Sequence, residues 1–213
     1  MKAEFWHNKW ERNEIGFHQS EINPFLKKHI DKLELSSGSR IFLPLCGKTR
    51  DIAWLLSEGY TIVGVELSEL AIEALFEDLK LTPNKVKTDD FIIYNAKNIT
   101  IYTGDFFKLS TELLGDVDAV FDRAALVALP DDLRISYAQH IVKITQYTPQ
   151  LLVTFQYDQS LMSGPPFSIS SQHLKSLYQS SFAIKSIETV ALEGGFRGKI
   201  SATESAWLLA KTK

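Results

Sequence analysis

Gly47 and Glu66 have the residue types and the spacing of a nucleoside-binding site. Gly47 ends the run Ile41-Phe-Leu-Pro-Leu-Cys-Gly47, in which a short apolar strand leads into a turn before a helical segment. Glu66 ends the next apolar run, 19 residues further along the chain. In Rossmann-like sheets a glycine turn and an acid about 20 residues later hold a ribose, because a carboxylate accepts hydrogen bonds from both hydroxyls of the diol. The spacing therefore predicts a site for an adenosine-containing cofactor.

The turn itself is poor in glycine, and this decides which cofactor we expect. Dinucleotide folds use three glycines so that a pyrophosphate can approach the helix N-terminus, whereas this turn has Gly47 alone. Gly47-Lys48-Thr49 looks like the end of a phosphate loop, but Phe42 stands where that motif needs its first glycine. Since S-adenosylmethionine is the common adenosine cofactor without a phosphate, we expect S-adenosylmethionine here.

Two further positions could contact such a cofactor or its co-substrate. Asp105 and Phe106 follow the third predicted strand, where the acid could accept from the adenine amine and the ring could pack on the base. The alternative is a turn acid beside a core phenylalanine. Arg123 follows Asp122 at the end of the fourth strand, at the edge where open α/β sheets bind ligands. It could stabilise an anionic substrate, or form a salt bridge with Asp122 or Asp118.

Aromatic and loop residues could enclose this site. Trp6 and Trp10 are spaced i, i+4, so both can lie on one helix face, and Phe17 follows them. These rings could pack the N-terminal segment onto the body or form a lid that excludes water from a charged methyl donor. Pro165 and Pro166 stiffen the end of one long loop, and Arg197 stands in a flexible one over residues 193–199.

A sheet whose strands end at one edge would bring these residues together. Strands are predicted over residues 41–45, 61–66, 99–103, 117–122 and 150–156, and helices over residues 24–33, 49–58, 69–79, 131–146 and 171–180. Their alternation predicts a parallel, doubly wound sheet. Residues 183–190 and 205–211 are two strands without a helix between them, which predicts an antiparallel terminal hairpin. The fold class is therefore α/β, with a seven-stranded, mostly parallel sheet and an antiparallel last strand; residues 91–95 are expected to pair with residues 99–103.

Bulk properties restrict the function classes. The 213 residues, 45% hydrophobic and 23% charged, fit one domain over 1–213, with residues 1–35 as an N-terminal lid and residues 36–213 as the cofactor-binding sheet. A net charge of -3, with scattered lysines and arginines, disfavours nucleic acid as a partner. No leader-like or membrane-spanning run is present, and Cys46 has no partner for a disulfide. Histidine spacing predicts no metal site. We expect a cytoplasmic monomer that acts on a small molecule.

Several motifs together resemble a known family. They are Phe42-Leu-Pro-Leu-Cys-Gly-Lys48, Val63-Gly-Val-Glu-Leu-Ser-Glu69, Asp122-Arg-Ala-Ala-Leu-Val-Ala128 and Gly164-Pro-Pro-Phe167, with Trp6, Trp10 and Phe17 before them. In this order they resemble the thiopurine S-methyltransferases, and the bacterial branch in particular. The resemblance implies a Rossmann-like class I methyltransferase that uses S-adenosylmethionine.

The resemblance also implies roles for individual residues. The expected cofactor contacts are Trp6, Trp10, Phe17, Leu45, Gly47, Glu66, Leu67, Asp105, Phe106 and Arg123. The expected substrate contacts are Phe17, Arg123, Pro165, Pro166 and Arg197. Arg123 and Arg197 are the expected catalytic residues, because a guanidinium favours the thiolate form of a thiol.

The implied reaction is in-line methyl transfer to the sulfur of an aromatic or heteroaromatic thiol. Enzymes that methylate the amino groups of nucleic-acid bases carry Pro-Pro-aromatic after the fourth strand, where this chain has Asp122-Arg-Ala-Ala; its Pro-Pro pair follows the fifth strand. Cytosine-C5 enzymes need a cysteine after the fourth strand, and Cys46 follows the first. A selenium or tellurium acceptor, another small molecule, or a role as a non-catalytic cofactor-binding regulator remain open.

Overall fold

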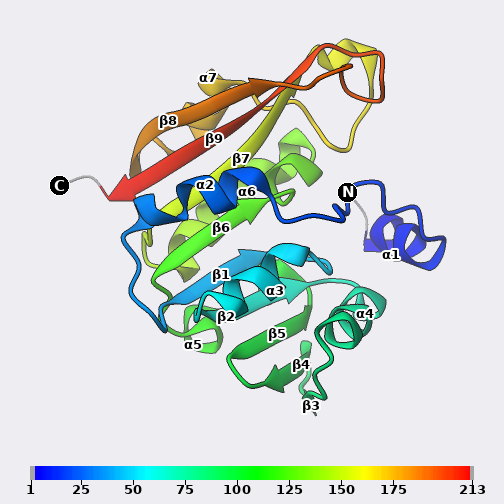
Figure 1. Cartoon of the computed structure of the whole chain (residues 1–213), viewed down its shortest axis with the longest axis vertical. Helices are drawn as coiled ribbons and strands as arrows, with labels where there is room; N and C mark the ends of the chain where they lie inside the picture. Colours follow the sequence, from blue (N-terminus) through cyan, green and yellow to red (C-terminus); the bar gives the residue numbers. More distant parts are fainter. Residues whose placement is uncertain (1–2, 212–213) are drawn as a thin grey trace.

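The computed structural model describes residues 3–211, which form one nine-stranded sheet with helices on both faces (Figure 1). The strands are β1 (Arg40–Pro44), β2 (Thr61–Glu66), β3 (Asn84–Lys87), β4 (Phe91–Ala96), β5 (Ile99–Gly104), β6 (Ala119–Arg123), β7 (Gln150–Tyr157), β8 (Phe182–Ala191) and β9 (Ala202–Lys211). Their order across the sheet is β3-β4-β5-β2-β1-β6-β7-β9-β8. β5, β2, β1, β6 and β7 run parallel, and β9 is antiparallel to both β7 and β8. The predicted α/β class and reversed last strand are confirmed.

The predicted number of seven strands is wrong, because residues 81–98 add two more at one edge. β4 pairs with β5 through a tight turn in which Asn98 has a φ of 61°, as expected for residues 91–95. β3 pairs with β4, and every residue of β3 is exposed. Its sequence Asn-Lys-Val-Lys therefore lacks the apolar pattern by which buried strands are recognised.

The helices form two layers and one outlying element. They are α1 (Ala3–Glu11), α2 (Pro24–His29), α3 (Arg50–Ser57), α4 (Glu69–Leu79), α5 (Thr111–Leu114), α6 (Asp131–Ile144) and α7 (Ser171–Tyr178), with 3-10 turns η1 (Ile30–Leu33), η2 (Phe106–Lys108), η3 (Leu126–Ala128) and η4 (Gln159–Leu161). Side chains of α2, α3 and α4 share a core with one sheet face, and those of α5, α6 and α7 with the other. None of the described residues of α1 is buried, and the helix packs beside α4.

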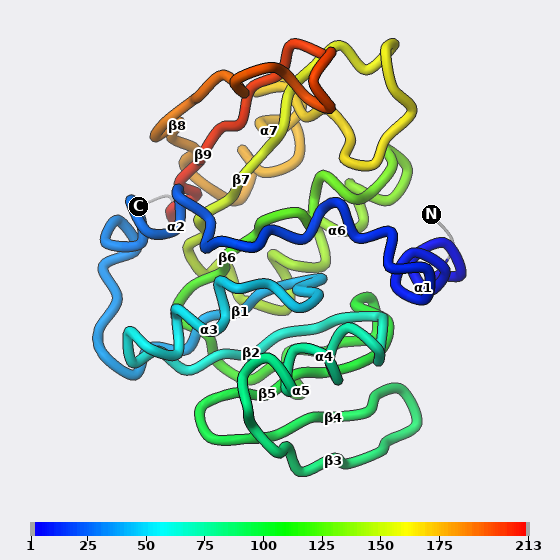
Figure 2. The backbone as a smooth tube through the Cα atoms, turned by 45° about the vertical axis from the view of Figure 1, so that its right-hand side comes forward, coloured from blue at the N-terminus to red at the C-terminus, as the bar shows by residue number. Residues whose placement is uncertain are grey.

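Parallel pairing aligns the strand ends from which the site is built. β1 pairs with β2 up to Pro44 and Val65, and β2 pairs with β5 up to Glu66 and Thr103. The helices that follow begin at hydroxyl caps, since Thr49 accepts from the Asp51 amide and Ser68 from the Ala71 amide. The chain between α1 and α2 then runs along this assembly beside β6, as the dark blue tube in Figure 2 shows. The carboxyl ends of the central strands therefore meet at one edge of the sheet, where Arg123 at the end of β6 contacts Phe17 of the N-terminal segment.

Candidate functional site

Glu66 joins the two turns that follow β1 and β2. Its Oε2 accepts from the Gly47 amide at 2.8 Å, and its Oε1 accepts from the Ser68 amide at 2.9 Å. The residue is only 7% exposed, and burial raises the pKa of its carboxyl group while the backbone hydrogen bonds oppose that change. Each oxygen has accepted one N–H, which leaves acceptor capacity for a ribose diol. Leu45 and Gly47, with φ of 47° and 52°, shape the turn beside it.

Trp10 covers this turn from the N-terminal segment. A Cβ placed on Gly47 would lie 3.2 Å from Cζ2 of Trp10, so the indole rests on the glycine backbone. Phe17 packs edge-on against both tryptophans, with ring centroids 5.6 Å from Trp6 and 5.6 Å from Trp10. The predicted pairing of the two tryptophans on one helix face is confirmed, since both lie in α1 and meet the same ring.

Arg123 ties the sheet to the N-terminal segment. It is the last residue of β6, and its guanidinium donates to the Phe17 carbonyl oxygen at 3.2 Å. Burial lowers the pKa of Arg123, and the carboxylates Asp51 and Glu204 oppose this effect. Asp118, offered as a partner from sequence, instead accepts from the Arg40 amide at the far end of β1.

Asp51 and Glu204 are acids of the site that the sequence patterns did not identify. Asp51 in α3 accepts from the Asn23 amide at 2.7 Å and from the Thr49 hydroxyl at 2.8 Å, so it fixes the start of α2. In the sheet, Arg123 of β6 pairs with Val153 of β7, and Val153 pairs with Ala206 of β9. Glu204 lies two residues before Ala206 in β9. Alternate residues of a strand share a face, so Glu204 stands on the face of Arg123. Asp51 could be suspected as a helix-start acid, whereas Glu204 becomes visible only through strand pairing.

Asp122 lies behind Arg123 and is fully buried. Its carboxylate accepts from the Tyr137 hydroxyl at 2.7 Å and from the Leu126 amide at 3.2 Å. Burial raises the pKa of Asp122 to about 6, with these hydrogen bonds opposing the rise. Neither partner is Arg123, so the salt bridge proposed from sequence between Asp122 and Arg123 is not formed. Asp122 instead fixes the turn between β6 and η3, where Ala124 has a φ of 65°.

Asp105 and Phe106 differ in how far their side chains are buried. Asp105 is exposed and caps η2 by accepting from the Phe107 amide at 3.0 Å. The Phe106 ring is 4% exposed and packs on Tyr137 at 4.9 Å and on His140 at 5.0 Å between centroids. Phe106 is therefore a core side chain covered by α6, and its contact with an adenine stays a prediction.

The two late loops approach one another through aromatic rings. Arg197 is exposed with a φ of 52°, and its guanidinium lies 5.4 Å from the Phe196 ring centroid. Phe196 packs on Phe155 and on Tyr157, whose hydroxyl donates to the Pro166 carbonyl oxygen at 2.8 Å. These contacts join the loops of Arg197 and Pro166.

Comparison with known proteins decides the family. A family model described as thiopurine S-methyltransferase matches residues 1–211. The chain is 46% identical over 211 residues to the thiopurine S-methyltransferase of Teredinibacter turnerae, covering 99% of this chain and 98% of that one. It is also 46% identical over 212 residues to the enzyme of the same name from Xanthobacter autotrophicus, covering 99% and 100%. The chain belongs to the thiopurine S-methyltransferase family.

The fold of this thiopurine S-methyltransferase family member recurs in solved methyltransferases of very different sequence. One is the 1,6-didemethyltoxoflavin-N1-methyltransferase of Burkholderia thailandensis with bound S-adenosylhomocysteine, at a TM-score of 0.67 and 12% identity, covering 98% of this chain and 87% of that one. The likeness shows a methyltransferase fold, and S-adenosylmethionine is the cofactor of the family to which the chain belongs.

The residues of the family site fit such a cofactor. Glu66 can still accept hydrogen bonds from a ribose. The turn has a single glycine, Gly47, which is sufficient because S-adenosylmethionine has no phosphate groups for a glycine-rich loop to bind. Cys46 behind the turn is buried, which raises the pKa of its thiol well above normal and disfavours a nucleophilic role. Within residues 3–211, no group of three or more His, Cys, Asp or Glu side chains could hold a metal ion. In the same part of the chain, no helix is long and apolar enough to cross a membrane.

Proposed function

We propose that this protein transfers the methyl group of S-adenosylmethionine to the sulfur of aromatic or heteroaromatic thiols. The observation that carries the proposal is the largely buried guanidinium of Arg123, held against the Phe17 carbonyl at the sheet edge where Glu66 braces the Gly47 turn. A fixed cation in a partly dehydrated position attracts an anionic sulfur more strongly than it would in water. The names of the relatives agree with this substrate class.

The cofactor would lie between the N-terminal segment and the sheet edge. In this arrangement Glu66 accepts from the ribose, Leu45, Gly47 and Leu67 line the turns beside it, and Asp105 offers an exposed carboxylate for the adenine amine. Phe106 would support the adenine-binding side of the site from the core. Trp6, Trp10 and Phe17 would cover the cofactor, because Trp10 lies on the Gly47 turn and Phe17 packs against both tryptophans. Residues 1–35 would therefore act as a lid and residues 36–213 as the cofactor-binding part of one domain.

The substrate would approach from the side of the late loops. Pro165 and Pro166, held by the hydrogen bond from Tyr157, would form one wall of the substrate site, and Phe17 and Arg123 would form another. Arg197, on an exposed loop stacked over Phe196, could swing toward an anionic ring substituent. When bound, S-adenosylmethionine supplies a sulfonium-activated methyl group that a sulfur nucleophile displaces in line. The protein's contribution is alignment, exclusion of water by the aromatic lid, and stabilisation of the thiolate by Arg123.

Replacement of Arg123 by alanine tests this assignment. We expect Arg123→Ala to lower kcat/KM for a thiopurine by roughly 100-fold or more, since a charge-assisted contact and the Phe17 tether are both lost. The melting temperature should fall by only a few degrees. Unchanged kcat/KM would contradict the role of Arg123.

A thiol panel and a binding measurement separate the competing functions. Products formed with labelled S-adenosylmethionine would be identified by mass spectrometry for a thiopurine, thiophenol and selenium or tellurium compounds. Methylated aromatic thiols would support the proposal. Calorimetric binding of S-adenosylmethionine with no methylated product from any acceptor would overturn it in favour of a cofactor-binding regulator. We place the reaction in the cytoplasm, where this cofactor is made and where a protein with the single thiol of Cys46 needs no disulfide.

A further inference from the structure

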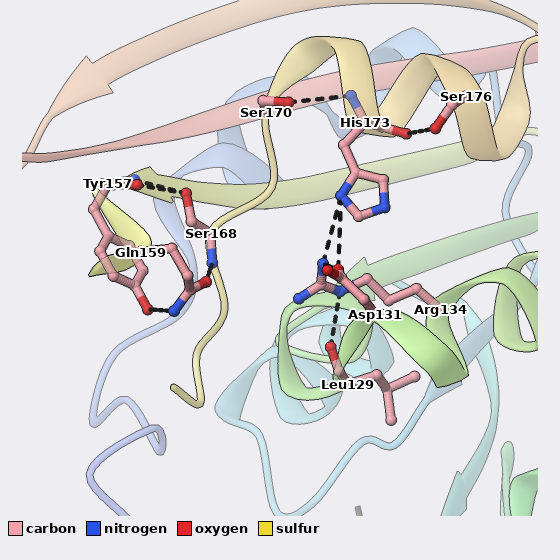
Figure 3. Close-up of polar contacts among 9 residues, drawn as sticks. All are labelled: Leu129, Asp131, Arg134, Tyr157, Gln159, Ser168, Ser170, His173 and Ser176. Carbon is pink, nitrogen blue, oxygen red and sulfur yellow. Dashed lines mark hydrogen bonds and ion pairs between the residues drawn. The ribbon is translucent and has the colours of Figure 1, made fainter. Parts of the chain in front are cut away.

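The loop between β7 and α7 is supported from behind by a polar cluster that the proposed reaction does not use. Figure 3 shows this cluster, with Arg134, Asp131 and His173 on one side and Tyr157, Gln159 and Ser168 on the other. Between them is an open cavity of about 390 Å³, lined by Arg134, Phe167, His173 and neighbouring serines. The loop itself carries Pro165 and Pro166, the residues proposed above to form one wall of the substrate site.

Arg134 is the centre of the cluster. It is 3% exposed although it belongs to the first turn of α6. Its Nε donates to the Leu129 carbonyl oxygen at 2.8 Å, and its guanidinium contacts the Asp131 carboxylate and His173 Nδ1, the latter at 3.4 Å. A guanidinium is rarely buried to this extent unless its N–H groups form hydrogen bonds and its planar face packs against another group.

The planar guanidinium of Arg134 packs against the ring of Phe167. The guanidinium carbon lies 5.2 Å from the Phe167 ring centroid, within the range of a cation–π contact. The same ring closes the turn that contains the two prolines, since a Cβ on Gly164 would lie 2.6 Å from its Cδ1. The Phe167 amide also donates to the Val127 carbonyl oxygen at 2.6 Å, which joins the turn to η3 beyond Arg123. The position of Phe167 therefore fixes the turn that presents Pro165 and Pro166.

Several other polar groups of the cavity are bonded to the protein. Gln159 donates to the Tyr157 hydroxyl at 2.8 Å and accepts from the Ser168 amide at 2.8 Å, and the Ser168 hydroxyl donates to the Tyr157 carbonyl oxygen at 2.7 Å. Ser170 accepts from the His173 amide at 3.1 Å. The Asp131 carboxylate, 82% exposed, would repel an anion beside Arg134. The cluster thus has the properties of a scaffold for the loop and not those of a ligand site.

We propose that Arg134 is a positioning residue for substrate binding, which acts through Phe167 to hold the Pro165–Pro166 wall at the distance that fits an aromatic thiol. This inference rests on the proposed function and adds a determinant of substrate affinity that lies outside the site. Contacts made equally to bound substrate and transition state change KM and leave kcat almost unaltered. Arg134 should therefore affect KM for the thiol and neither kcat nor cofactor affinity.

Steady-state kinetics of Arg134→Lys test the proposal. Lysine keeps the charge but loses the planar group that stacks on Phe167. We expect KM for a thiopurine to rise roughly tenfold, with kcat within about twofold and the calorimetric Kd for S-adenosylhomocysteine unchanged. Phe167→Leu should give the same rise, and the double variant should resemble either single variant, since both changes interrupt one contact. Independent, multiplicative effects on KM would overturn the route through Phe167.

Arg40→Lys is the matched control. Arg40 also uses its guanidinium to bind backbone carbonyls, those of Leu114 at 2.6 Å and Asp116 at 2.8 Å, but at the opposite end of the sheet. If both lysine variants lower the melting temperature and neither changes KM, Arg134 is merely structural and the proposal is overturned. If Arg134→Lys does not fold, Phe167→Leu decides in the same way. A wild-type protein inactive on every thiol would instead refute the proposed function, and this inference with it.

Discussion

At the scale of single residues, Glu66 shows how one carboxylate can serve the fold and the cofactor together. Its two oxygens each accept one backbone N–H, from Gly47 and Ser68, and so fix the turns that border the cofactor site. Burial raises the pKa of the group, but the two donated hydrogen bonds favour its charged form. The ribose would therefore meet an oriented anion that does not have to be reorganised on binding.

We expect Glu66→Gln to weaken S-adenosylhomocysteine binding by roughly 10- to 100-fold, which corresponds to the usual free-energy contribution of hydrogen bonds to a charged group. The amide nitrogen of glutamine would also face a backbone N–H donor. Isothermal titration calorimetry measures the effect. Glu69→Gln is the control, because Glu69 accepts from the Tyr94 hydroxyl at 2.7 Å and is only three residues away. Equal affinities for the two variants would contradict the role of Glu66.

Asp122 makes stability depend on pH near neutrality. Burial raises the pKa of Asp122 to about 6 in the folded protein, above the ordinary aspartate value of 3.8 that applies to the unfolded chain. Between these values the folded state binds the proton more tightly, so falling pH stabilises the fold through this group. Relative to Asp122→Asn, which does not titrate, the unfolding free energy of the wild type should rise by roughly 1 kcal/mol from pH 7 to pH 5. Urea titrations measure it, and parallel pH profiles would contradict the assignment.

At the scale of elements, α1 differs from every other helix of the described chain in how it is held. It buries none of its residues, and its attachment depends on Trp10 above Gly47, on the rings around Phe17, and on the hydrogen bond from Arg123 to the Phe17 carbonyl. α6, in contrast, buries six residues in the core. An element with few buried contacts opens at low free-energy cost.

Hydrogen exchange should therefore distinguish the two helices. We expect amides of α1 to exchange much faster than those of α6 in the free protein, and addition of S-adenosylhomocysteine to slow α1 by roughly tenfold or more, because the ligand would hold the lid closed. The amides of α6 should change little. If α1 exchanged at the same rate with and without the ligand, it would not act as a lid.

Sequence patterns predict those elements whose burial requires a regular spacing of apolar residues. The buried strands β1, β2 and β5 and the helices α4 and α6 begin within about two residues of the expected positions, since apolar periodicity and caps define them. β3 was missed because an exposed edge strand needs no apolar residues. The helix predicted over residues 24–33 ends at His29 as an α-helix and continues as η1.

At the scale of the whole molecule, the two sheet edges limit association with further chains. β3 carries Lys85 and Lys87 at one edge, and β8 carries Lys185 and Glu188 near the other, so charges interrupt both outer strands. Large exposed apolar side chains, such as Leu70, are distributed over separate elements. We therefore expect a monomer of about 24.1 kDa in sedimentation equilibrium. A dimer at micromolar concentration would contradict this.

The sequence alone determined the cofactor class and the central sheet, because the Gly47 turn, the acid at Glu66 and alternating apolar runs are local patterns with one common structural solution. Tertiary structure decided everything that depends on pairing between distant segments. It placed Glu204 on the face of Arg123, directed Asp122 to Tyr137, covered Phe106 with α6, and set Arg134 behind Phe167. These contacts join residues far apart in the chain, and no local spacing encodes the distance at which two folded elements meet.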